Sequence, residues 1–192
     1  MKVEIRSATE AVIEGYVNAV ERESRAIPSP FGSYTERVAA GTFQKALNSG
    51  KPVELRFNHQ RVLDSTQGSL ELREDSIGLH ARAVITDAEV IEKAKRGELR
   101  GWSFGFKDNN PKIENSKRVL NDIELREVSI LDKTPAYIAT SIELRGEDSE
   151  TIENRGYEDL AEVTENEQQE ERQAVDYSIY KNKITLLQLG GK

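Results

Sequence analysis

The stretch GELRGWSFGF, residues 97–106, carries the strongest structural pattern in the sequence. Successive side chains of an extended strand point to opposite faces, so its three aromatic residues fall on one face. The other face carries one hydroxyl, that of Ser103, between Gly101 and Gly105. The pattern predicts a strand that buries a bulky face in the core and leaves a serine on a face without neighbouring side chains.

The rest of the chain alternates between strand and helix patterns. Period-two alternation and turn residues predict mainly strands, and two segments predict short helices. The predicted strands are 11–20, 53–59, 69–75, 77–85, the aromatic strand, 118–132 and 138–145. The predicted helices are 39–50, closed by Gly50, and 86–99, with a capping box of Thr86 and Glu89 and with Gly97 at its end.

Charge divides the chain into a body and a tail. The net charge is −7. Residues 147–192 hold 12 acidic and 5 basic residues, so the tail accounts for the whole imbalance and the body is electroneutral. We therefore divide the chain into a domain at 1–146 and an acidic, flexible tail at 147–192, with a short docking element near 176–189. A neutral body argues against a nucleic-acid surface.

Several classes of protein and site are excluded by composition. The chain has no cysteine, which rules out disulfides, thiolate nucleophiles and cysteine-bound zinc. It has no apolar run long enough to span a bilayer, and its first residues lack the apolar core of a signal peptide. We expect a cytosolic protein without a membrane partner. The strand pattern predicts a mainly β fold, a closed or nearly closed β-barrel with peripheral helices, with a β-sandwich as the competing architecture.

Ser103 is a candidate nucleophile. A hydrolytic serine needs a base within hydrogen-bond reach, a third group that orients the base, and room for a peptide to lie alongside. The flanking glycines provide that room. A small serine in a tightly packed strand gives the same pattern, so a purely structural role stays open.

The sequence offers few bases. Its two histidines are His59 and His80. His59 ends the strand 53–59, where a side chain is held rigidly and still reaches a cleft. His80 lies in the middle of the strand 77–85, on the face opposite Leu79, and we expect it to face solvent. A histidine that merely caps an apolar strand face is the structural alternative for His59.

A carboxylate could orient that base. In DIELREVSIL, residues 122–131, the apolar phase shifts between Leu125 and Val128. A one-residue shift indicates a β-bulge, and bulges re-aim side chains beside active sites. Glu127 lies inside the shift and is the first candidate, while Glu124 is the alternative on the same segment.

Five segments in order carry a family resemblance. They are GYVNAV (15–20), ERVAAGTFQKAL (36–47), FNHQ (57–60), GELRGWSFGF (97–106) and LREVSILDKTPAY (125–137). Together they resemble the prohead, or capsid maturation, protease family of tailed bacteriophages and prophages. The resemblance covers about residues 3–145.

The resemblance implies a serine endopeptidase with a closed antiparallel β-barrel of the herpesvirus-protease (assemblin) type. It places the family's histidine at His59 and its serine at Ser103. The third member in the herpesvirus relatives is a second histidine downstream of the serine. This chain has no histidine after Ser103, so Glu127 is the replacement.

The resemblance also implies the partners and the place of action. The substrate would be the scaffolding segment of the major capsid protein, cut inside the assembling prohead in the bacterial host cytoplasm, and the protease would cleave itself. No cofactor is expected, and a homo-oligomer stays open. Two rivals remain: a non-enzymatic capsid assembly or scaffolding protein, and a metal-dependent hydrolase that uses His59 and His80, whose spacing fits no common ligand motif.

Overall fold

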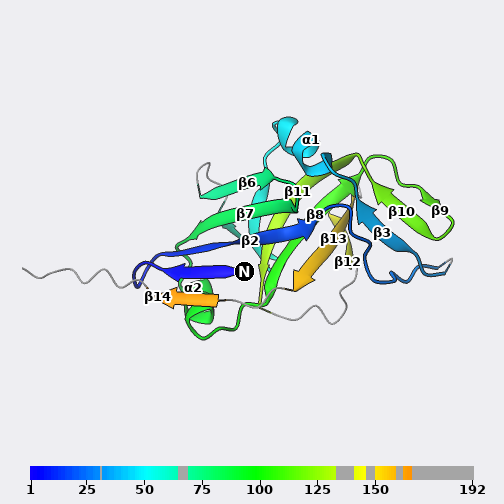
Figure 1. Cartoon of the computed structure of the whole chain (residues 1–192). Helices are drawn as coiled ribbons and strands as arrows, with labels where there is room; N and C mark the ends of the chain where they lie inside the picture. The colour runs from blue at the N-terminus through cyan, green and yellow to red at the C-terminus, as the bar shows by residue number, and fades with distance from the viewer. Residues whose placement is uncertain (31, 65–68, 133–140, 146–149, 159–161, 166–192) are drawn as a thin grey trace, which may run out of the picture.

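The computed structural model describes residues 1–30, 32–64, 69–132, 141–145, 150–158 and 162–165. In this part the chain is mainly β, with three sheets and two helices (Figure 1). The helices are α1 (Thr42–Asn48) and α2 (Ala88–Lys95). None of the described helices is long and apolar enough to cross a membrane.

The strands form two larger sheets and one small sheet. The five-stranded sheet has the order β14-β1-β2-β7-β6, formed by Glu162–Glu165, Lys2–Ile5, Ala11–Ala19, Gly78–Ile85 and Leu70–Glu74. The six-stranded sheet has the order β12-β13-β8-β11-β4-β5, formed by Ser141–Arg145, Glu150–Glu158, Gly101–Asp108, Ile123–Leu131, Glu54–Phe57 and Arg61–Asp64. The small sheet has the order β3-β10-β9, formed by Thr35–Val38, Lys117–Leu120 and Ile113–Glu114.

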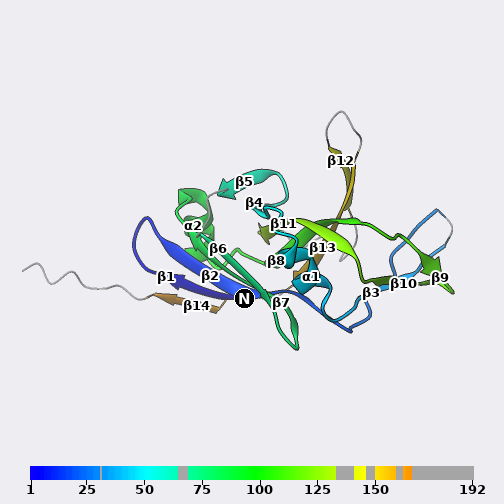
Figure 2. The same cartoon turned by 90° about the horizontal axis from the view of Figure 1, so that it is seen from above.

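The prediction of a closed barrel is wrong. The larger sheets end at β14 and β6 and at β12 and β5, and no pairing within the described part of the chain joins these edges. A barrel needs its first and last strands to pair. Both views place the small sheet at one end of the molecule and α2 toward the other, and the two larger sheets remain open (Figures 1 and 2).

The two larger sheets share one hydrophobic core. Buried side chains of β1, β2 and β7 belong to the same cluster as those of β4, β8 and β11. Trp102, Phe104 and Phe106 are all fully buried, which confirms the predicted bulky face. Phe104 packs edge-on against Phe43 of α1, with ring centroids 5.2 Å apart.

Several local predictions are confirmed, and one is wrong. The predicted strands 69–75 and 77–85 correspond to β6 and β7, which pair with each other in an antiparallel hairpin. Gly50 and Gly97 follow the two helices with positive φ angles of 70° and 65°, where glycine is favoured. The capping box is wrong, because the side chain that caps α2 is that of Asp87, which accepts the Val90 N–H at 3.0 Å.

The acidic segment also contributes strands. β13 and β14 lie beyond the predicted boundary at 146/147, and they pair with β8 and β1. The flexible-tail prediction is therefore wrong for 150–158 and 162–165, because pairing partners far away in the sequence supply the order that the local composition lacks. The predicted docking element at 176–189 lies outside the described residues.

A buried ionic network attaches β13 to the small sheet. Arg118 of β10 contacts Asp108 and Glu153, each at 2.6 Å, and Glu36 at 3.2 Å. Arg155 of β13 contacts Glu36 at 2.6 Å and Glu153 at 2.7 Å. Burial lowers the pKa of Arg118, but its hydrogen bonds to Glu153 and Asp108 outweigh that effect and raise the pKa above its usual value.

The charge balance of this network predicts unequal effects of two variants. The network holds two cations and three anions. Arg118→Met should therefore destabilise the fold by about 3–5 kcal/mol, because it leaves buried carboxylates without a positively charged partner. Glu153→Gln should cost clearly less, since it leaves two charges of each sign. Denaturant unfolding of both variants measures the difference, and equal losses would contradict this account.

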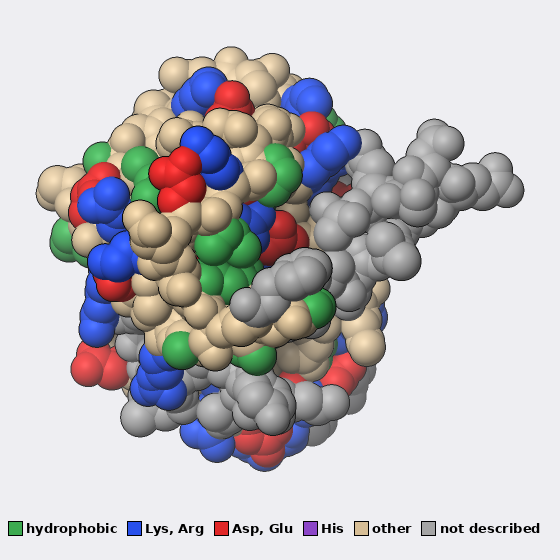
Figure 3. All heavy atoms as spheres, turned by 90° about the vertical axis from the view of Figure 1, so that its right-hand side faces the viewer, with side chains coloured by type: hydrophobic (Ala, Val, Ile, Leu, Met, Phe, Trp, Pro, Cys, Tyr) green, Lys and Arg blue, Asp and Glu red, His purple; other side chains and the backbone are tan. Residues whose placement is uncertain are grey.

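Charges on the end of the molecule that carries the small sheet are mixed. Figure 3 shows basic and acidic side chains interspersed on this face, with apolar side chains between them. Lys117 and Glu23 form one exposed ion pair here, with 2.7 Å between Nζ and Oε1. The described side chains on this face therefore carry charges of both signs.

Candidate active site

Ser103 lies in the middle of β8, between β11 and β13. Its cross-strand neighbours are Ser129 on β11 and Gly156 on β13. The residue is only 1% exposed. Its hydroxyl donates a hydrogen bond to the backbone carbonyl of Arg155, with 2.6 Å between the oxygens. The serine is therefore fixed in a buried position on the face opposite the aromatic residues.

A bulge in β11 brings Glu127 onto the same face. The pairing of β11 with β8 shifts register between Leu125 and Glu127, which confirms the predicted bulge. After the shift Glu127 lies opposite Gly105, two residues along β8 from Ser103. Paired residues in a sheet point to the same side, so the carboxylate and the hydroxyl share a face. Glu127 is 1% exposed.

Gly105 is needed for the carboxylate to lie there. A Cβ atom at this position would come within 2.6 Å of the Glu127 Cγ and 2.7 Å of the Asn154 Oδ1. Real Cβ atoms do not approach other atoms so closely, so any larger residue would displace one of these side chains. The bare face of β8 therefore makes room for side chains of the neighbouring strands, whereas the sequence suggested room for a substrate.

A turn in an uncommon conformation carries His59. Asn58 and His59 follow β4 with φ angles of 51° and 63°, the left-handed region that few non-glycine residues adopt. The Asn58 side chain holds this turn, because it donates to Asp132 Oδ1 at 2.8 Å and accepts the Asp132 N–H at 3.2 Å. Such strain clusters at functional sites.

His59 and Glu127 form a hydrogen-bonded pair. Nδ1 of the ring lies 2.7 Å from Oε1 of the carboxylate, although the two residues are 68 positions apart. An ionised carboxylate only accepts, so we assign the proton to Nδ1, which makes Nε2 the basic nitrogen. The pair thus has the chemistry of an oriented general base.

Arg56 contacts both members of the His59–Glu127 pair, and the sequence analysis did not identify it. Its Nε lies 2.9 Å from Oε2 of Glu127, the oxygen that His59 does not use. Its Nη1 donates to the backbone carbonyl of His59 at 3.1 Å. One guanidinium therefore fixes both the carboxylate and the turn that carries the imidazole. Alternation in 53–59 places Arg56 on the face opposite Leu55 and Phe57, and this is the sequence pattern that could have indicated its position.

The other candidates lie in different surroundings. Glu124 pairs with Lys51 at 2.8 Å and with Arg126 at 2.9 Å. His80 is half-buried against the ring of Tyr16, with centroids 5.1 Å apart, and is not simply facing solvent as expected. Within the described ranges no cluster of His, Asp and Glu side chains has an arrangement that could hold a metal ion.

A comparison with models of protein families identifies the family to which the chain belongs. The model of the caudovirus prohead serine protease family matches residues 1–155. The chain belongs to this family. Neither the curated proteins nor the solved structures contain a match. This prohead protease is therefore a serine peptidase that acts in the maturation of a phage capsid.

In the prohead protease, Ser103 and His59 are not hydrogen-bonded to each other. Among the described residues, the Ser103 hydroxyl hydrogen-bonds only to the Arg155 carbonyl. Glu127 lies opposite Gly105, two residues along β8 from Ser103, and two residues along a strand span about 6.7 Å. Hydrogen bonds between catalytic groups often tighten only when substrate binds.

Proposed function

We propose that Ser103, His59 and Glu127 are the catalytic triad of this prohead protease. Its substrate is the scaffolding segment of the major capsid protein, cut inside the assembling prohead in the host cytoplasm, and the protease also cleaves itself. The observation that supports the triad is the 2.7 Å hydrogen bond between His59 and a buried carboxylate on the face that carries Ser103.

Each residue has one chemical task in this proposal. The Ser103 Oγ attacks the carbonyl carbon of the scissile bond and passes its proton to Nε2 of His59. Glu127 accepts from Nδ1 and balances the charge of the imidazolium. The same Nε2 then gives the proton to the leaving amine as the C–N bond breaks. Water activated by His59 hydrolyses the ester and restores the hydroxyl.

Arg56 supports this pair without touching substrate. A buried carboxylate keeps its charge only when it is paired and hydrogen-bonded. Arg56 occupies one oxygen of Glu127, which directs the other oxygen to His59. It acts as a positioning residue, because the same guanidinium contacts Glu127 through Nε and the backbone carbonyl of His59 through Nη1.

Labelling with a fluorophosphonate tests the nucleophile. Tryptic digestion releases residues 101–107 as GWSFGFK, in which Ser103 is the only hydroxyl-bearing residue. We expect the adduct on this peptide, and we expect no adduct on it in Ser103→Ala. Ser129 lies on a different tryptic peptide, EVSILDK, so the two cross-strand serines are separated. An adduct found on EVSILDK alone would contradict the assignment.

A further inference from the structure

β13 occupies the place that an extended peptide substrate would take. It runs antiparallel along β8, the strand that carries Ser103, over six residue pairs from Glu153↔Phe106 to Glu158↔Gly101. Extended peptides commonly bind by adding a strand to the edge of a sheet. The chain thus presents one of its own strands to the proposed nucleophile.

One peptide bond of β13 lies at the serine hydroxyl. The Ser103 Oγ donates to the carbonyl oxygen of Arg155 at 2.6 Å. The next residue, Gly156, is the cross-strand partner of Ser103 and has no side chain to cover the hydroxyl. The carbonyl carbon bonded to that oxygen is the electrophile that this hydrogen bond places beside the hydroxyl.

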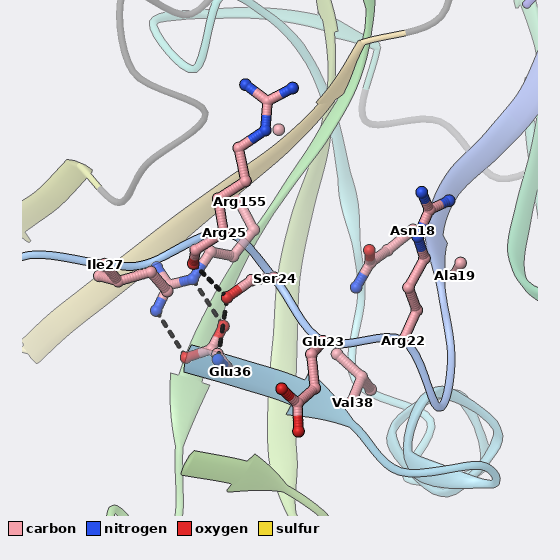
Figure 4. A pocket seen from close by; sticks show the side chains of 11 residues that line it. Asn18, Ala19, Arg22, Glu23, Ser24, Arg25, Ile27, Glu36, Val38 and Arg155 are labelled. Carbon is pink, nitrogen blue, oxygen red and sulfur yellow. Dashed lines mark hydrogen bonds and ion pairs between the residues drawn. The ribbon is translucent and has the colours of Figure 1, made fainter. Parts of the chain in front are cut away.

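Side chains before this bond fix its register. The Arg155 guanidinium turns toward Glu36, with Nε 2.6 Å from Oε1, in a pocket of about 310 Å³ (Figure 4). It also lies over the ring of Phe106, 5.3 Å from the centroid. Glu153 contacts Arg118 at 2.6 Å. Three contacts on the amino-terminal side therefore hold the strand where it is.

Asn154 adds a contact on the serine face. It lies opposite Gly105 in the pairing of β13 with β8, and it is buried. Its Oδ1 approaches the space above Gly105 together with the Glu127 Cγ. The residue before Arg155 thus places its side chain over Gly105, on the face that also carries Glu127 and Ser103.

We propose that Arg155–Gly156 is the bond that this protease presents to its own Ser103, and that it is cut within one chain. The inference rests on the proposed function of Ser103. The Oγ forms an ester with the Arg155 carbonyl carbon, and its proton passes through His59 to the Gly156 nitrogen as the C–N bond breaks. Water then releases Arg155 as a carboxylate. The family match ends at residue 155, so the fragment removed lies beyond the matched segment.

Mass spectrometry of the full-length protein tests the position of the cut. We expect fragments 1–155 and 156–192 to appear on incubation of the wild type and to be absent from Ser103→Ala. The rate should be first order, with a half-time that does not change on dilution, because nucleophile and bond belong to one molecule. A half-time that lengthens in proportion to dilution would overturn the proposal.

Labelling of Ser103 and cleavage at 155/156 distinguish a failure of this inference from a failure of the proposed function. If Ser103 is labelled by fluorophosphonate and the capsid protein is cut, but no cut occurs between 155 and 156, only this inference is overturned. If Ser103 is not labelled and no serine-dependent cut occurs anywhere, the proposed function falls as well. A cut at this bond in Ser103→Ala would also overturn the inference, since another protease would then be responsible.

A substitution of Arg155, compared with a matched control, tests whether its contacts hold β13 in register with β8. Arg155→Met removes the contacts with Glu36 and Glu153, and a displacement of about 1 Å costs about 100-fold in rate. We expect the cut at 155/156 to slow by about that factor. Arg25→Met is the control, because Arg25 is exposed and lines the same pocket outside the network. Equal rates in the two variants would contradict the anchoring, and the dilution measurement on the wild type does not depend on either variant.

Discussion

Replacing Ser103 with alanine should lower the rate of capsid-protein cleavage by about 10⁶-fold, the loss that follows removal of a catalytic serine in other peptidases. The change deletes only one oxygen atom, which makes a single hydrogen bond among the described residues. The variant should therefore fold normally. Cleavage of the capsid protein in assembled proheads, followed by gel electrophoresis and mass spectrometry, measures the effect.

Ser129→Ala is the matched control for this prediction. Ser129 is the cross-strand neighbour of Ser103, is fully buried, and its hydroxyl has no hydrogen-bond partner within the described ranges. Removal of that hydroxyl should leave cleavage close to wild type. Normal capsid maturation by Ser103→Ala would instead favour a non-enzymatic assembly role for this chain.

Glu127→Gln should lower the rate by about 10⁴-fold, because loss of the carboxylate leaves the imidazole in the wrong tautomer and orientation. His59→Ala should cost more, about 10⁶-fold, since it removes the base itself. Glu124→Gln is the control of the same chemistry three positions earlier, and its carboxylate pairs with Lys51 and Arg126. Loss of activity in Glu124→Gln alongside a fully active Glu127→Gln would transfer the third role to Glu124.

A steric variant addresses the same carboxylate independently. Gly105→Ala adds a Cβ 2.6 Å from the Glu127 Cγ and changes the identity of no proposed triad residue. It should reduce cleavage by about 100-fold or more, because the carboxylate must move away from the imidazole. Near-normal activity of this variant would mean that the position of Glu127 matters less than we propose.

The sequence was informative where a local pattern determines the structure. Alternation placed Trp102, Phe104 and Phe106 in the core, and the phase shift revealed the bulge that turns Glu127 toward the face of Ser103. Both signals depend only on neighbouring residues along one strand. The proposed role of His59 came from its place at the end of a strand.

The errors arose where distant segments meet. Alternation indicates strands but does not say which edges pair, so it could not exclude a closed barrel. The acidic composition of 147–192 hid β13, whose Glu153 and Arg155 are paired with charges of other strands. Arg56 was missed because an arginine beside Glu54 on a strand face is typical of a solvated surface.

The capping error has a simple physical cause. Thr86 and Asp87 are adjacent, and both residue types are good helix caps. The structure uses Asp87, which also pairs with Arg61 of β5. A contact with another strand therefore distinguishes two positions that local rules treat as nearly equal.

The most direct test of the central claim is the rate at which fluorophosphonate labels Ser103 in four proteins: wild type, His59→Ala, Glu127→Gln and the double variant. If Glu127 acts on Ser103 only through His59, the double variant will be labelled no more slowly than His59→Ala. If the two losses multiply, the carboxylate acts independently of the imidazole, and the proposed triad is contradicted.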